Sequence, residues 1–169
     1  MAKALFIRRS DIVKNTALNA NVDTDKFIQF IKIAQEIHIR NYLGTDLYNK
    51  ISNDIAGVGG ASLTGAYLTL VNTYIQPMLI HFAMVDYLPF AAYQIKNGGV
   101  FKHTSENAET VSKTEVDFLV NKARNTAEYY TQRFLDYINN NSNLFPEYNQ
   151  NQGGDVYPDS DGLFNGWVL

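Results

Sequence analysis

Residues 24–42, TDKFIQFIKIAQEIHIRNY, decide the fold of this chain because they form its most extensive apolar helical pattern. At about 100° per residue, polar side chains occupy one narrow strip of a helix and apolar side chains occupy the rest. The strip consists of Gln29, Lys32, Glu36 and Arg40. Solvent can therefore contact only a small part of this helix, and most of its circumference must be packed against other protein segments.

Two sources of cover are compatible with this apolar surface. Either the helix is the central helix of its own domain, or a neighbouring subunit covers part of it, because a small domain seldom buries one helix all round. The candidates for such a subunit contact are Phe27, Ile28, Ile33 and Ile39.

The ends of this helix are marked by capping residues. Asp23, Thr24 and Asp25 supply a cap and negative charge at its amino end, and Gly44 predicts a left-handed cap at its carboxyl end. Thr45 is then suited to be the N-cap of the next helix. That helix carries Leu47, Tyr48, Ile51 and Ile55 at the spacing of a buried face.

Further helices follow the glycine-rich segment 57–65. Pro77 either kinks the next helix or opens a new one, because proline lacks the amide donor and clashes with the preceding turn. The most apolar stretch, Met78–Tyr93, contains His81 and Asp86 and is shorter than the roughly 20 residues that span a bilayer. We expect a core helix here and no membrane partner.

The last helix has the clearest periodicity and is capped by Ser112 or Thr114. Its apolar positions are Val116, Leu119, Val120, Ala123, Ala127, Tyr130, Phe134, Tyr137 and Ile138. Before it, residues 100–110 predict either one arm of a small hairpin with residues 92–96 or a surface loop.

These elements predict a mainly α fold, a small helical bundle with a short hairpin or loop excursion. A chain of 169 residues with 46% apolar content can close one core. We therefore expect one domain, residues 1–140, followed by an extended arm, residues 141–169, where the composition turns to Asn, Gly, Asp and Pro.

This expected arm contains regularly recurring apolar anchors. Such a segment typically lies along a groove or sheet edge of a partner and becomes ordered on binding, although a frayed terminus or one folded back onto its own domain would have the same composition. The predicted partner-binding residues are Phe145, Tyr148, Tyr157, Leu163, Phe164, Trp167 and Leu169.

Composition limits the classes of function. A net charge of −3 removes the attraction that supplies most non-specific affinity for nucleic acid, so specific DNA binding is disfavoured. The chain has no cysteine, which excludes disulfides and thiolate chemistry. Aromatic residues make up 13% of the chain and charged residues only 18%, a balance that favours protein interfaces; the alternative is an aromatic-rich core.

No group of residues predicts catalysis, a cofactor or a metal. His38, His81 and His103 are far apart in sequence and share no metal-ligand spacing. His38 and His81 lie on apolar segments, so we interpret these two as core histidines satisfied by local hydrogen bonds. His81 and Asp86 are five residues apart, too far round a helix for a catalytic relay. We therefore expect no catalytic residue, no cofactor and no metal site.

Several short segments resemble one family. They are FIQFIKIAQ at 27–35, YLGTDLY at 42–48, IQPML at 75–79, NGGV at 97–100, KAR at 122–124 and AEYY at 127–130. Together they look like the head–tail adaptor proteins of crAss-like and other Bacteroidetes tailed phages, over roughly residues 4–148.

This resemblance implies a structural virion protein made in the host cytoplasm and located at the head–tail junction of the capsid vertex. Adaptors of this kind form a ring of copies, twelve to match the portal, and genomic DNA passes through the lumen without specific binding. The implied partners are the portal protein, adjacent copies of the chain, and further ring or tail proteins. A carboxy-terminal arm would grip the portal. The alternatives are a small soluble helical interaction module or an enzyme accessory unrelated to the virion.

Overall fold

The computed structural model of the chain describes residues 4–16, 24–91, 93–96, 99–102 and 112–160. Helices account for most of these residues, and the two strands among them form one short hairpin. The prediction of a mainly α fold is confirmed.

The elements follow one another along the chain with short connections. The helical elements are α1 (Arg9–Asn15), α2 (Thr24–Ala34), η1 (Gln35–Ile39), α3 (Arg40–Ala56), η2 (Val58–Gly60), α4 (Gly65–Thr69), η3 (Leu70–Ile75), α5 (Gln76–Ala91), α6 (Lys113–Asn140), η4 (Ser142–Leu144) and α7 (Pro146–Gln150). The strands are β1 (Tyr93–Lys96) and β2 (Gly99–Lys102), paired antiparallel with Tyr93 opposite Lys102. Of the two alternatives for this region, the hairpin is the one formed.

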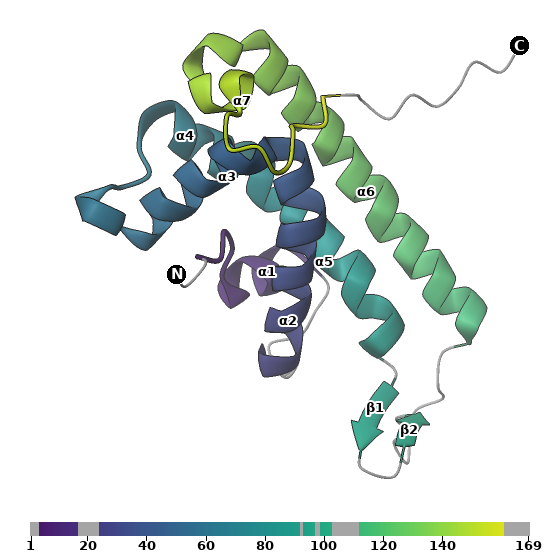
Figure 1. The fold of residues 1–169 in the computed structure, drawn as a ribbon. Coiled ribbons are helices and arrows are strands. Elements are labelled where there is room, and N and C mark those ends of the chain that lie inside the picture. Colours follow the sequence, from purple (N-terminus) through teal and green to yellow (C-terminus); the bar gives the residue numbers. More distant parts are fainter. Residues whose placement is uncertain (1–3, 17–23, 92, 97–98, 103–111, 161–169) are drawn as a thin grey trace, which may run out of the picture.

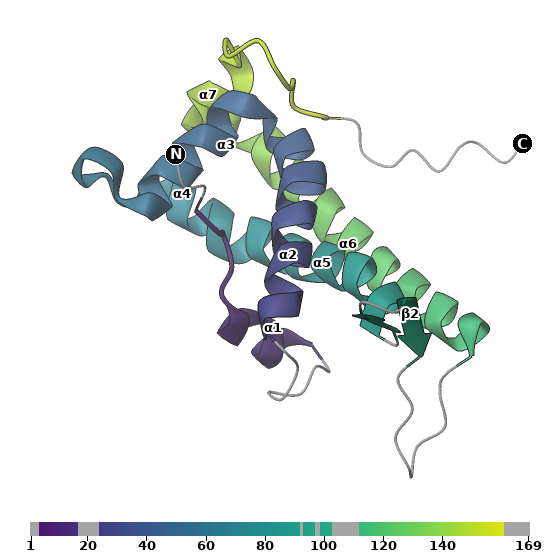
Figure 2. The ribbon, with the colours of Figure 1, turned by 60° about the horizontal axis from the view of Figure 1, so that its bottom comes forward.

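Helix α5 is the central helix of the bundle and lies between α2 and α6, as both views show (Figures 1 and 2). On one side, the rings of Phe27 and Tyr87 lie 4.8 Å apart. On the other side, His81 of α5 stacks on Tyr130 of α6 at 5.6 Å, and in the preceding turn η3 Tyr74 stacks on Tyr137 at 4.2 Å. One of the two interpretations of residues 24–42 made them the central helix, but α5 occupies this position.

Helix α2 is covered on one side only. Phe27 and Ile39 are buried in the protein's own core, which corrects their assignment as subunit contacts. Ile28 is half-buried, whereas Ile33 is 43% and Ile37 60% exposed. The helix widens into a π-helical turn at η1, where the amide of Arg40 donates to the carbonyl of Gln35 five residues back. This extra residue in the turn changes which side chains face the core.

Residues Gly65–Ala91 run as one helix through α4, η3 and α5. Pro77 has no amide to donate to the preceding turn, and the helix widens into a π-helical turn over Leu70–Ile75 immediately before it. By length and composition alone this helix could cross a bilayer, but half of its apolar window is buried inside the fold. Its packing against α2 and α6 favours the expected core helix.

The first part of the predicted arm belongs to the folded domain. Phe145 is fully buried and Tyr148 is 8% exposed, and both belong to the hydrophobic core. The ring of Tyr67 meets Phe145 edge-on at 5.3 Å, and its hydroxyl donates to Glu147 at 2.6 Å. The predicted boundary at residue 140 is therefore wrong, because the chain folds back after α6, so that Phe145 packs on Tyr67 of α4 and Tyr137 of α6, and α7 packs against α3.

Candidate functional site

The candidate site is the helix break at Gly44, which the carboxy-terminal segment 151–160 crosses. Gly44 has φ +72° and ψ 167° inside what is otherwise a continuous helix. The positive φ confirms the predicted break, although ψ differs from that of a left-handed helical cap. We call residues 151–160 the strap.

Backbone hydrogen bonds hold the strap to the break. The amide of Thr45 donates to the carbonyl of Val156, and the amide of Val156 donates to Thr45 Oγ1, both at 2.9 Å. The amide of Asp159 donates to the carbonyl of Asn41 at 2.9 Å. The predicted role of Thr45 as an N-cap is therefore corrected, because its hydroxyl accepts from the strap.

Asn151 supplies the missing cap from the other end of the chain. Its Oδ1 accepts from the amide of Asp46 at 3.2 Å, and its Nδ2 donates to the carbonyl of Val156 at 2.8 Å. Asp46 in turn accepts from the amide of Gly153 at 3.2 Å. Asn151 is 2% exposed and has φ +33°, a left-handed conformation that asparagine tolerates better than most residues. One buried amide side chain thus satisfies backbone groups of both segments.

Gly44 is required by space as well as by backbone conformation. A Cβ atom built at this position would lie 2.7 Å from both Cδ and Cγ of Pro158 and 2.9 Å from Asn151 Oδ1. The strap therefore lies directly against the glycine.

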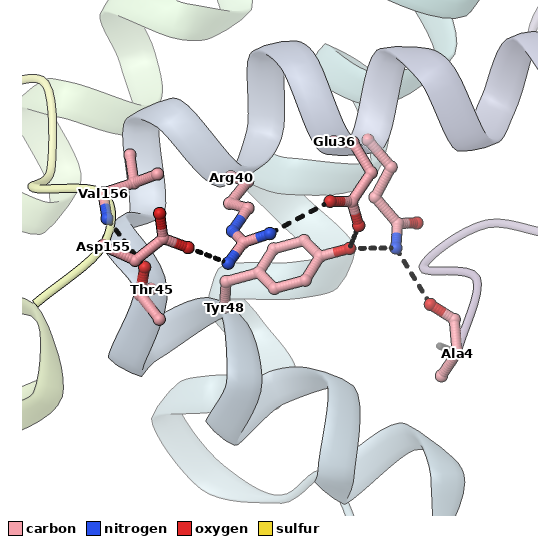
Figure 3. Close-up of polar contacts among 8 residues, drawn as sticks. Ala4, Glu36, Arg40, Thr45, Tyr48, Asp155 and Val156 are labelled. Carbon is pink, nitrogen blue, oxygen red and sulfur yellow. Dashed lines mark hydrogen bonds and ion pairs between the residues drawn. The ribbon is translucent and has the colours of Figure 1, made fainter. Parts of the chain in front are cut away.

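A network of polar side chains continues from the strap toward the amino-terminal segment (Figure 3). Arg40 pairs with Asp155 of the strap and, at 3.2 Å, with Glu36. Glu36 accepts from the Tyr48 hydroxyl at 2.7 Å. Tyr48 also accepts from Gln35 Nε2 at 2.9 Å.

Gln35 completes this network at the amino-terminal segment. Its Nε2 donates to the carbonyl of Ala4 and its Oε1 accepts from the amide of Phe6, both at 2.9 Å. Burial is the main cause that raises the pKa of Tyr48 to about 12, and Glu36 adds to the shift. Residues 4–6, the helix break and the strap are therefore connected through side chains of η1 and α3.

His38 and His81, the two histidines that the structure describes, each stack on a different aromatic ring. His38 stacks on Phe82 with ring centres 4.0 Å apart, and its Nε2 lies 4.0 Å from Asp86 Oδ2. Burial lowers the pKa of His38, partly opposed by Asp86. His81 stacks instead on Tyr130 at 5.6 Å. Within the described ranges, no three His, Asp or Glu residues could hold a metal ion.

Stacking replaces the hydrogen bonds that we expected for these two residues. Both rings are half-buried, and no hydrogen bond involves them in the described part of the chain. His103 lies outside the described residues.

The predicted partner-binding residues divide into three groups. Phe145 and Tyr148 are core residues, so they cannot anchor a partner in this fold. Tyr157 lies on the strap and is 72% exposed. The remaining four lie outside the described residues: Leu163, Phe164, Trp167 and Leu169.

The sequence did not reveal the role of the strap residues. Asn151, Asp155 and Val156 contact positions more than 100 residues away, and no local pattern encodes such contacts. The available signal was indirect, since an asparagine and a proline in a polar segment are compatible with a specific turn as well as with an unstructured tail.

Comparison with known proteins adds a family but no activity. The family described as a family of unknown function, DUF6712, matches residues 39–158, from the last residue of η1 to Pro158 in the strap. No curated protein and no solved structure matches the chain. Residues 151–158 of the strap thus lie inside the region that the family shares.

Proposed function

We propose that this chain, which belongs to the family of unknown function DUF6712, is a structural virion protein, a head–tail adaptor of a tailed phage. In this role, copies form a ring beneath the portal, and genomic DNA passes through the lumen without specific binding. The function then resides in interfaces between chains, with no catalytic step.

The observation that carries this proposal is the distribution of exposed apolar side chains. They occur on several parts of the chain. The exposed large apolar side chains among the described residues are Ile33, Ile37, Val58, Leu68, Phe90, Phe118, Leu119, Tyr129, Leu144 and Tyr157. A ring subunit needs two different lateral contacts and an axial one, and apolar side chains exposed on several elements are compatible with this role.

Charge also supports the proposal. A net charge of −3 does not favour tight contact with phosphates. A channel that DNA must pass through benefits from weak contact, because tight binding would slow the passage of DNA.

The strap holds the beginning of the proposed portal-binding segment in a fixed position on α3. It is attached to α3 up to Asp159, and Tyr157 is exposed on it. We assign portal binding to Tyr157 and to the apolar residues that follow the strap. These are Leu163, Phe164, Trp167 and Leu169.

The test is to combine the purified full chain with the portal protein of the same phage genome and to image the mixture by electron microscopy. We expect rings on the portal. A chain truncated after Ser160 keeps the strap and should retain its helical circular dichroism and melting temperature while losing portal binding. The substitution Gln152→Ala, on an exposed strap residue that makes no hydrogen bond in the described part of the chain, is the matched control and should bind normally. A chain that stays monomeric and indifferent to the portal contradicts the proposal, and an unchanged affinity after truncation contradicts the assignment of the tail.

A further inference from the structure

The beginning of α6 extends beyond the end of α5. The stacked pairs His81–Tyr130 and Tyr74–Tyr137 fix the antiparallel register of the two helices. Continued in the same register, Ala91 at the end of α5 is level with about residue 120 of α6. The turns Lys113–Leu119 therefore project past the helix that covers the rest of α6.

An exposed stripe runs along this projecting part. Glu115, Phe118, Leu119 and Lys122 are spaced by three, one and three residues, so they share one side of the helix. The fully buried residues Ala127, Phe134 and Ile138 are centred about 130° further round the helix, and Leu119 is the stripe residue nearest to them. Phe118 is 67% and Leu119 46% exposed, and both charged residues are exposed. We call these four residues the outer stripe.

The outer stripe is complementary to itself. In a second copy that runs antiparallel, the four positions have the same spacing, and the acidic and basic ends are exchanged. We propose that a second copy of this chain docks on it, antiparallel, about a two-fold axis between Phe118 and Leu119. Each Phe118 then packs on the second copy's Leu119, and each Glu115 lies opposite the second copy's Lys122.

The charged groups are available for these pairs. Ser112 donates its amide and hydroxyl hydrogens to the same oxygen of Glu115, Oε2, at 2.8 and 2.7 Å. The other carboxylate oxygen can accept from a lysine. Lys122 forms no ion pair within the described part of the chain. A parallel arrangement would instead place like charges together, so the charges select the antiparallel one.

The proposed contact buries a small area and joins only two copies of the chain. Eight residues of helix span about 12 Å, well short of the roughly 800 Å² per partner of a standard interface, so we expect a dissociation constant on the order of 0.1 mM. A two-fold contact cannot propagate around a ring. The proposal thus goes beyond the adaptor role, and it concerns the association of the free protein.

Charge exchange between two variants gives the first test, by sedimentation equilibrium of the full chain. Lys122→Glu places two acidic residues on each outer stripe, and Glu115→Lys places two basic residues there. The dissociation constant of the dimer should therefore rise at least tenfold for each variant alone. An equimolar mixture should recover it, because every pair between the two variants is then opposite in charge. Lys113→Glu makes the same change in net charge on an exposed residue outside the stripe and should leave the dimer unchanged.

Spin labels give the second test, of direction and register. Because the chain has no cysteine, single labels can be placed at Asn125→Cys or Gln132→Cys on the exposed side of α6. At 1.5 Å per residue from the proposed axis, the distances along the helix between the two copies are about 20 and about 40 Å. Equal distances would indicate parallel helices and would overturn the proposal.

The outcomes separate this inference from the adaptor role. A free protein that is monomeric at millimolar concentration, or a mixture that fails to dimerise, overturns the two-fold contact even if rings form on the portal. A dimer that follows these charge rules supports the contact even if the chain never binds a portal.

Discussion

The two ends of α6 have similar apolar periodicity and very different surroundings. Towards its carboxyl end, Phe134 and Ile138 are fully buried, where α6 packs against α5 and η3. Towards its amino end, Leu119 lies at the edge of the same apolar face and is 46% exposed. The difference arises because Leu119 lies at this edge and because α5 ends level with about residue 120 of α6.

This comparison shows that periodicity defines which positions of a helix are apolar, whereas the length of the neighbouring helix decides which of them are covered. The covered end contributes to folding through burial. The uncovered end keeps apolar area that another chain can bury. The two ends should therefore respond differently to the same substitution.

The largest effect is expected from a phenylalanine at each end. Phe134→Ala should lower the free energy of unfolding by about 3–5 kcal/mol, because it opens a cavity in the core. Phe118→Ala, on the exposed part, should change it by less than about 0.5 kcal/mol. Urea unfolding followed by circular dichroism measures both. Similar losses would mean that the first turns of α6 are covered after all.

A second expected effect concerns the glycine beneath the strap. Gly44→Ala should destabilise the protein by about 2–3 kcal/mol, because the positive φ is unfavourable and the new Cβ overlaps Pro158. Gly60→Ala is the matched control, since φ is +81° there and nothing lies within 4 Å of the new Cβ. It should cost about 1 kcal/mol from the backbone alone. Equal losses would show that the strap is not seated on Gly44.

The sequence predicted local features of the fold well. The break at Gly44 depends on neighbouring residues and is confirmed, and of the two caps predicted for α6, Ser112 or Thr114, Ser112 is the one formed. Ser112 Oγ accepts from the amide of Glu115, as the capping pattern requires. Such features follow from backbone conformation within one turn, so a single sequence contains the information.

Features that depend on distant contacts could not be predicted. Phe145 looked like an anchor in a polar tail, yet it meets Tyr67, 78 residues earlier in the chain, in the core. Asn151 caps a helix that begins 105 residues earlier. The candidate site was missed for the same reason, because composition can indicate that a segment is polar but not what it contacts.

A smaller effect is expected at the cap that Asn151 provides. Asn151→Ala should lower the free energy of unfolding by about 1–2 kcal/mol, because the amide of Asp46 and the carbonyl of Val156 each lose a partly buried hydrogen bond. Gln152→Ala, one residue along the strap, should change it by less than about 0.5 kcal/mol. Hydrogen exchange should show the loss of protection concentrated at Asp46. A loss spread evenly over α3 would contradict a local cap.

The smallest effect concerns titration at the two ends of α6. At the covered end, burial beside Tyr130 lowers the pKa of His81, whereas at the exposed end hydrogen bonds from Ser112 lower the pKa of Glu115. Because the pKa of His81 is lower in the folded than in the unfolded chain, its contribution to stability is present above about pH 6.5 and is lost as the pH falls through the folded pKa.

NMR titration can separate these two causes. Tyr130→Ala removes the cover of His81 and should return its pKa toward 6.5 without moving Glu115. Ser112→Ala should raise the pKa of Glu115 without moving that of His81, because it removes the hydroxyl that donates to Glu115 while the backbone amide of residue 112 still donates. If Tyr130→Ala left the pKa of His81 unchanged, the burial that lowers this pKa would come from α5 alone. The difference in titration between the two ends of α6 would then not depend on the packing of α6.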